Sequence, residues 1–206
     1  MTNDITHHPS DETLAAFASG TLDEARSLVV SIHRSLCAAC GHAVDQYEAI
    51  GGALLEQALP VSMRPGALQA ALGSIGTSAQ GAEIASEQLL DRHKLGPWRR
   101  VWPGLQQRAV SVAGDSDIKV FMLKAAPGIT LPHHKHTGDE WTCVLEGAFE
   151  HQFGRYGPGD FDEADETVDH KPRICSDVPC VCIVALQGSI RLQSFLGQLI
   201  QPILRF

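Results

Sequence analysis

The sequence predicts a chain in two parts, a helical N-terminal half followed by an all-β C-terminal half. In the first half, apolar residues recur at helical spacing, as at Leu14, Phe17 and Ala18. From Trp98 onward, short apolar runs such as IKVFML and CVCIVALQG are separated by Gly, Pro and Asp, which is typical of strands joined by turns. We therefore expect an α plus all-β architecture, with a barrel or sandwich in the second half.

Capping signals place the first two helices. Ser10 is suited to cap a helix over the run DETLAAFAS, and Gly20 is suited to end it in the left-handed conformation. Thr21 and Glu24 fit a capping box, in which the threonine caps the helix and the glutamate bonds back to it. The second helix is therefore expected to begin at Thr21.

The helical pattern then continues to about Gln57, which is long for one globular helix. Gly41, or the pair Gly51 and Gly52, is expected to bend or end it. A short helix is expected near residues 65–72. Together these segments predict a bundle of about four helices.

Residues 73–87 are small and polar without clear periodicity, so they are the best candidate for a linker. This divides the chain into a helical domain over 1–85 and a β domain over 86–206.

Charge and composition narrow the classes of partner. Residues 1–95 hold 11 acidic and 5 basic side chains, a balance of −6 out of the net −8, which disfavours direct binding to nucleic acid and suits a partner with a basic surface. We see neither a secretion signal nor a stretch of roughly 20 apolar residues that spans a membrane. The expected location is the cytoplasm, where six cysteines are more typical of metal ligands, redox groups or core residues than of structural disulfides.

The first candidate site is the H-x3-C-x2-C pattern of His33, Cys37 and Cys40. At 100° per residue these positions fall within a stripe of about 60° on one helix, so a single helix is expected to present an imidazole and two thiolates to one ion. Zn²⁺ prefers such ligands in tetrahedral array, and His7 and His8 offer a fourth. The alternatives are two cysteines and a histidine that pack in the core, and a redox C-x-x-C, which lacks the preceding strand of a thioredoxin-like unit.

This pattern, with the run SDETLAAFASGTLDEARSLVVSIHRSLCAAC, resembles the zinc-binding anti-sigma domain, and especially that of ChrR-type anti-sigma factors. The resemblance implies a four-helix domain that holds an extracytoplasmic-function sigma factor away from core RNA polymerase. It also implies that His8 is the fourth ligand, beside His33, Cys37 and Cys40.

The second candidate site lies in PGITLPHHKHTGDEWTCVLEGAFE, which fits G-x5-H-x-H-x3-E-x6-G. His134 and His136 share a strand face, Glu140 has the same parity, and His170 is available on a later strand. Three imidazoles and one carboxylate suit several divalent metals. A cluster of surface histidines is the alternative.

The pattern of the second candidate site is similar to the motif that comes first in cupin sequences. This resemblance implies a cupin β-barrel. The commonest cupin form has a Pro-x-Gly before the last histidine, whereas Val168 and Asp169 precede His170 here, a departure that ChrR-like cupins share. By this resemblance the metal of the cupin site is expected to be Zn²⁺.

Cys180 and Cys182 lie two residues apart in an apolar strand, so both sulfurs are expected on one side. Their Cα atoms are then about 6.6 Å apart, at the edge of disulfide geometry. They are either a strained, easily reduced redox pair or two small core residues. Cys143 and Cys175 are expected to pack.

Two functions fit these observations. The first is an anti-sigma factor in which the helices bind the sigma factor through apolar residues such as Leu14, Phe17, Leu28 and Val29, and release it on a signal at the cupin. The resemblance implies singlet oxygen or a related oxidant as that signal. The second is a metal-dependent cupin enzyme, a dioxygenase or isomerase, which leaves the N-terminal motif unexplained.

Overall fold

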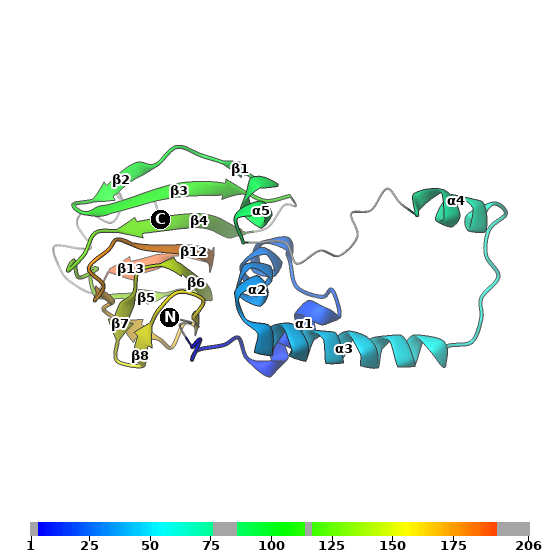
Figure 1. The fold of residues 1–206 in the computed structure, drawn as a ribbon. Coiled ribbons are helices and arrows are strands. Elements are labelled where there is room, and N and C mark those ends of the chain that lie inside the picture. Colours follow the sequence, from blue (N-terminus) through cyan, green and yellow to red (C-terminus); the bar gives the residue numbers. More distant parts are fainter. Residues whose placement is uncertain (1–3, 76–85, 114–116, 193–206) are drawn as a thin grey trace.

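A computed structural model describes residues 4–75, 86–113 and 117–192. Figure 1 shows the helices of the first half gathered on one side and the strands of the second half on the other. Within the described residues, no helix combines the length and the apolar character that a membrane span requires. The predicted order, helices followed by strands, is confirmed.

The first helix is confirmed and the predicted start of the second is wrong. Helix α1 (Asp11–Ala18) is capped by the Ser10 side chain, which accepts from the backbone N–H of Thr13, and it ends before Gly20 at φ +69°. Helix α2 (Glu24–Leu36) is capped by Asp23 rather than Thr21. The Asp23 carboxylate accepts from the backbone N–H of Arg26 at 2.9 Å, and a charged oxygen at this position also favours the positive end of the helix dipole.

The long helical run breaks at Cys37 and not at either glycine position. Cys37 is extended (φ −113°, ψ 103°); it ends α2 through its N–H and begins α3 (Ala38–Glu56) with its sulfur. The prediction that His33, Cys37 and Cys40 share one helix is therefore wrong. The break turns the two thiols and the imidazole towards one point from two helices.

The helix predicted near residues 65–72 does not pack with the other helices of the first half. Helices α1, α2 and α3 contact one another, whereas α4 (Ala67–Ser74) has no buried residue and lies apart from them in Figure 1. Helix α5 (Ser86–Asp91) follows and packs on α2. Most of the predicted linker, residues 76–85, lies outside the described residues.

Within the described residues, the strands form three antiparallel sheets. The largest has seven strands, namely β1 (Lys94–Leu95), β2 (Arg99–Trp102), β3 (Leu105–Ser111), β4 (Ile118–Ala125), β6 (Glu140–Glu146), β9 (Phe161–Ala164) and β12 (Cys180–Gln187). A second sheet joins β10 (Asp169–His170), β5 (His134–His136) and β13 (Ile190–Leu192), and a third joins β11 (Arg173–Ile174), β7 (Phe149–His151) and β8 (Gly154–Tyr156). Across the described ranges, this pairing does not close into one barrel.

The large sheet is buried on both faces, as strand β12 shows. Its residues alternate between two hydrophobic clusters, with Val181, Ile183 and Ala185 on the helix side. Cys180, Cys182, Val184 and Leu186 lie on the side that packs against the small sheets. A strand covered on both faces is expected to be apolar throughout, which explains the run CVCIVAL.

Helix α2 joins the two halves. It packs on α1 and α3 and also on β4, β6 and β12, through buried residues that include Leu28, Val29, Val30 and Ile32. Its Arg26 donates to the carboxylate of Asp139 and, at 2.7 Å, to the amide oxygen of Gln187, and its guanidinium lies over the ring of Trp141. The helical half is therefore held against the β half by a shared hydrophobic core and by the polar contacts of Arg26.

The observed cap predicts the effect of two neighbouring substitutions on stability. Asp23→Ala removes the acceptor for the first turn of α2 and is expected to lower the free energy of unfolding by about 1 kcal/mol. Thr21→Ala is the matched control and is expected to change it by less than half as much. Urea unfolding of both variants measures this, and equal losses would show that Thr21 contributes to the cap as much as Asp23.

Candidate metal centres

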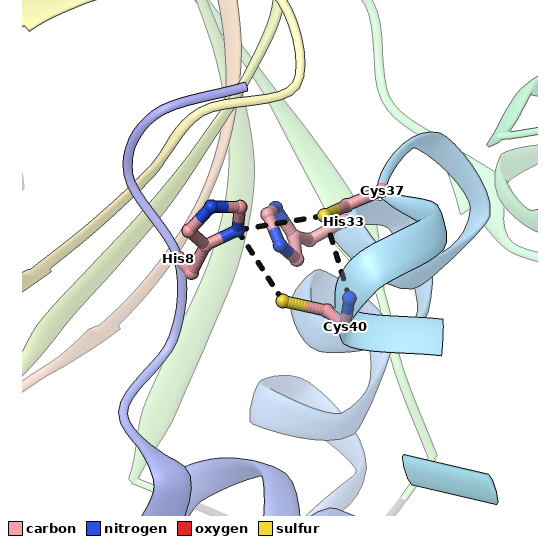
Figure 2. A group of neighbouring side chains, drawn as sticks. All are labelled: His8, His33, Cys37 and Cys40. Carbon is pink, nitrogen blue, oxygen red and sulfur yellow. Dashed lines mark hydrogen bonds between the residues drawn. The ribbon is translucent and has the colours of Figure 1, made fainter. Parts of the chain in front are cut away.

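The four residues predicted for the N-terminal site come together. His8, His33, Cys37 and Cys40 each place one ligand atom within 4.8 Å of the others. The Nδ1 atom of His8 lies 3.4 Å from each of the two sulfurs (Figure 2). Tetrahedral zinc with the usual Zn–N and Zn–S bond lengths separates N and S ligands by about 3.5 Å, so the spacing fits.

His33 passes a further test of fit. Its ring is fully buried, and its Nδ1 donates to the backbone carbonyl of Gly159 at 2.7 Å, which leaves Nε2 without a proton. That Nε2 is buried with no hydrogen-bond partner among the described residues. Burial lowers the pKa of His33 to about 4. A neutral imidazole with an unshared lone pair, oriented by a carbonyl on its other nitrogen, is the usual form of a metal-binding histidine.

The electrostatics of the thiols also favour a cation. Burial, and then the neighbouring Cys37, raise the pKa of Cys40 to about 12. Two buried thiolates side by side are therefore unstable on their own. A divalent ion reverses this balance, because a coordinating thiol is deprotonated. His7, the other histidine considered for the fourth position, instead stacks on Tyr156 and approaches Asp160.

The four residues predicted for the second site also come together. His134, His136, Glu140 and His170 form one group with ligand atoms within 4.8 Å of one another. His134 and His170 are paired directly across β5 and β10, so their side chains share a face. The Nε2 atom of His170 lies 3.0 Å from that of His134 and 3.1 Å from that of His136. Glu140 reaches the group from the start of β6, and its Oε2 lies 3.6 Å from His136 Nδ1.

Two buried ring nitrogens of this second group, His136 Nδ1 and His170 Nδ1, have no hydrogen-bond partner among the described residues. His134 donates its Nδ1 proton to the carbonyl of Pro132 at 2.7 Å, so its Nε2 carries none. Burial lowers the pKa of His136 to about 4 and that of His170 to about 2. Burial, together with Asp162, raises the pKa of Glu140 to about 8. Three converging imidazole nitrogens and a carboxyl group are therefore suited to a cation at their centre.

A residue pair beside this group is not apparent from the sequence. His151 Nε2 donates to the carboxylate of Asp162 at 3.0 Å, and the His151 ring lies 5.1 Å from the ring of His170. Asp162 lies with its carboxylate in the cavity between the sheets, near Glu140 and His170. Strand alternation in the run Phe161-Asp162-Glu163 was the only available signal. His133, in contrast, is half exposed and pairs with Asp169, outside the group.

Cys180 and Cys182 are placed on the same side, as the strand pattern predicts. Both are buried, and their sulfurs lie 3.6 Å apart as free thiols. They line the same cavity as Glu140 and His170.

Comparisons with known proteins agree with both halves. Residues 86–189 match the family model of the ChrR cupin-like domain. The chain is 33% identical to the anti-sigma-E factor ChrR of Cereibacter sphaeroides, over 98% of this chain and 99% of that protein. The crystal structure of SigE in complex with the anti-sigma ChrR from Rhodobacter sphaeroides superposes with a TM-score of 0.75 at 34% identity, over 89% of this chain and 99% of that chain.

The two groups predict the metal content of the chain. Protein purified under reducing conditions is expected to hold two metal ions, and replacing Cys37 and Cys40 together by Ser is expected to leave one. His42→Ala is the matched control, because His42 lies on the same helix near Cys40 but bonds Gln46 instead of the group. Elemental analysis by mass spectrometry counts the ions. Two ions in the double variant would exclude the cysteines as ligands.

Proposed function

The chain belongs to the ChrR family of anti-sigma factors, and from this we propose that it binds an extracytoplasmic-function sigma factor and keeps it from core RNA polymerase. The observation that carries the proposal is similarity over nearly the full length to a protein named for this activity. The described partner of the superposed relative is itself a sigma factor, SigE. We propose that binding takes place in the cytoplasm.

The apolar residues predicted from the sequence to bind the sigma factor are buried or partly buried within the protein itself. Leu14, Leu28 and Val29 are buried in the core of the protein, and Phe17 packs against it. Leu14, Leu28 and Val29 hold α1 and α2 in place, and no partner reaches these three without unfolding the helices. Phe17 is partly exposed. The sequence pattern identified an apolar stripe but did not distinguish a stripe that faces the core from one that faces a partner.

An exposed apolar surface lies instead on the end of α3 and on the segment that follows. Leu54 and Leu55 are 65% and 76% exposed. The other large apolar side chains exposed in residues 50–75 are Ile50, Leu59, Val61, Met63, Leu68, Leu72 and Ile75. Exposed apolar surface of this extent marks a binding site for another protein. Residues 1–95 as a whole carry an acidic balance of −6, which complements the basic surface expected of a DNA-binding partner.

We propose that the N-terminal group binds Zn²⁺ through His8, His33, Cys37 and Cys40. Its role is structural: it fixes the junction of α2 and α3 and thus the direction in which α3 presents the apolar surface. A closed set of two thiolates and two imidazoles leaves no position for a substrate.

We propose that the second group binds a divalent metal, with Zn²⁺ favoured by the family resemblance, through His134, His136, Glu140 and His170. Its role is to sense an oxidant, singlet oxygen by the same resemblance, rather than to turn over a substrate. The support is its position: Asp139, directly before Glu140, is bound by Arg26 of α2. A change at the metal is thereby passed to the helix that also carries His33.

The apolar surface yields a test by substitution. Replacing Leu54 and Leu55 together by Asp is expected to weaken sigma-factor binding at least about 30-fold, because buried apolar anchors contribute about 2 kcal/mol or more. Val178→Asp is the control, since Val178 is also exposed, at 48%, but lies on the β half. Binding is measured by calorimetry with the purified sigma factor. Unchanged affinity in the double variant would place the interface elsewhere.

The division of labour between the halves yields a second test. Replacing His134 and Glu140 together by Ala is expected to leave sigma-factor binding within about threefold of the wild type but to blunt release by singlet oxygen. A reporter gene under the sigma factor, with and without a photosensitiser in the light, measures both properties. Constitutive reporter activity in the dark would show that the second group is needed for inhibition itself.

A further inference from the structure

A buried carboxylate of the β half holds the chain just before His8. Asp160 is only 4% exposed, and its Oδ1 accepts from the backbone N–H groups of Thr6 at 2.7 Å and His7 at 2.9 Å. Its Oδ2 accepts from the N–H of Gly157 at 2.7 Å. Hydrogen bonds to a charged acceptor are roughly twice as strong as neutral ones, so this buried charge is well compensated.

The neighbours of Asp160 complete the attachment. The N–H of Phe161 donates to the carbonyl of His7 at 3.0 Å. Gly159 has φ +90°, and a Cβ atom there would lie 2.5 Å from Cδ1 of Ile5, so the N-terminal segment lies directly against this backbone. The N-terminal segment is thus held up to His7 by hydrogen bonds from its N–H groups and to its carbonyl group. His8 is the next residue, and its ring turns to the two sulfurs (Figure 2).

We propose that Asp160 is a positioning residue of the N-terminal metal site, through its hold on the backbone that carries His8. His8 itself is exposed, so packing alone does not orient it. His8, the fourth ligand, loses backbone freedom when it binds the metal. The hydrogen bonds from Thr6 and His7 restrict this backbone in advance, so less freedom is lost on binding. This inference rests on the metal site proposed above.

One consequence concerns communication between the two metal groups. Gly159 accepts from His33, and Asp160 holds the segment before His8, so two of the four N-terminal ligands depend on this one stretch of the β half. Two residues later, Asp162 enters the cavity beside His170. Residues 159–162 therefore contact the surroundings of both groups.

Cobalt binding to the full-length chain tests the proposal. Co²⁺ bound by thiolates gives a charge-transfer absorption that the cysteine-free second group does not produce, so the signal reports the N-terminal site alone. Asp160→Asn replaces one acceptor oxygen by an amide that faces an N–H group. It is expected to weaken Co²⁺ binding at this site about tenfold and to alter the absorption of the bound ion.

The matched control is Glu163→Gln. It makes the same change of charge three residues further along, on β9, but Glu163 bonds Ser10 and Thr13, beyond His8. It is expected to bind Co²⁺ within about twofold of the wild type. If Asp160→Asn binds Co²⁺ and absorbs like the wild type, the proposal is overturned. It is also overturned if Glu163→Gln weakens Co²⁺ binding as much as Asp160→Asn does, because Asp160 then has no specific role.

Two further measurements separate the modes of failure. If the wild type itself gives no thiolate absorption with Co²⁺, the proposed metal site is wrong, and the role of Asp160 falls with it. If Asp160→Asn does not fold, Thr6→Pro removes one donor to the carboxylate and leaves the bond from Gly157 in place. Weaker binding in this variant supports the proposal, and unchanged binding overturns it.

Discussion

The hydrogen bond from His33 to the carbonyl of Gly159 is the interaction on which the rest of the arrangement depends. It crosses from α2 to the β half inside the shared core, where neither group reaches water. An unpaired polar atom at this depth costs about 1–3 kcal/mol, so the bond fixes the docking of the two halves. The bond uses Nδ1 of His33, so Nε2 keeps the lone pair. It also orients the ring so that Nε2 faces Cys37, Cys40 and His8.

From that point, helix α3 connects the chemistry to the partner. Its first turn contains Cys40, and its last turns carry the exposed Leu54 and Leu55. The ligand group and the proposed sigma-binding surface are thus opposite ends of one helix. In this account, loss of the N-terminal ion frees the start of α3 from α2 and removes the fixed direction of its apolar end. The β half takes part because Gly159 and Asp160 supply contacts to that same ligand group.

Sequence patterns predicted which candidate ligands come together, because such patterns are local and distinctive: His134, His136 and Glu140 follow from strand parity and His33, Cys37 and Cys40 from spacing. They failed at Cys37, because helical periodicity continues through a break that tertiary contacts impose. They failed again for Leu28 and Val29, because an apolar stripe has the same pattern whether it faces a core or a partner. The sequence carries no signal for Asp160 and only strand alternation for Asp162, since their roles depend on contacts with residues more than 100 positions away or with another sheet.

The central claim is that this chain holds a sigma factor, and purification of the tagged, full-length protein from its own cells tests it most directly. The purification is done under reducing conditions without chelators, and partners are identified and quantified by mass spectrometry. The account predicts an extracytoplasmic-function sigma factor in nearly equal molar amount, lost when Leu54 and Leu55 are both replaced by Asp. A folded, metal-loaded bait that recovers no sigma factor would contradict the account.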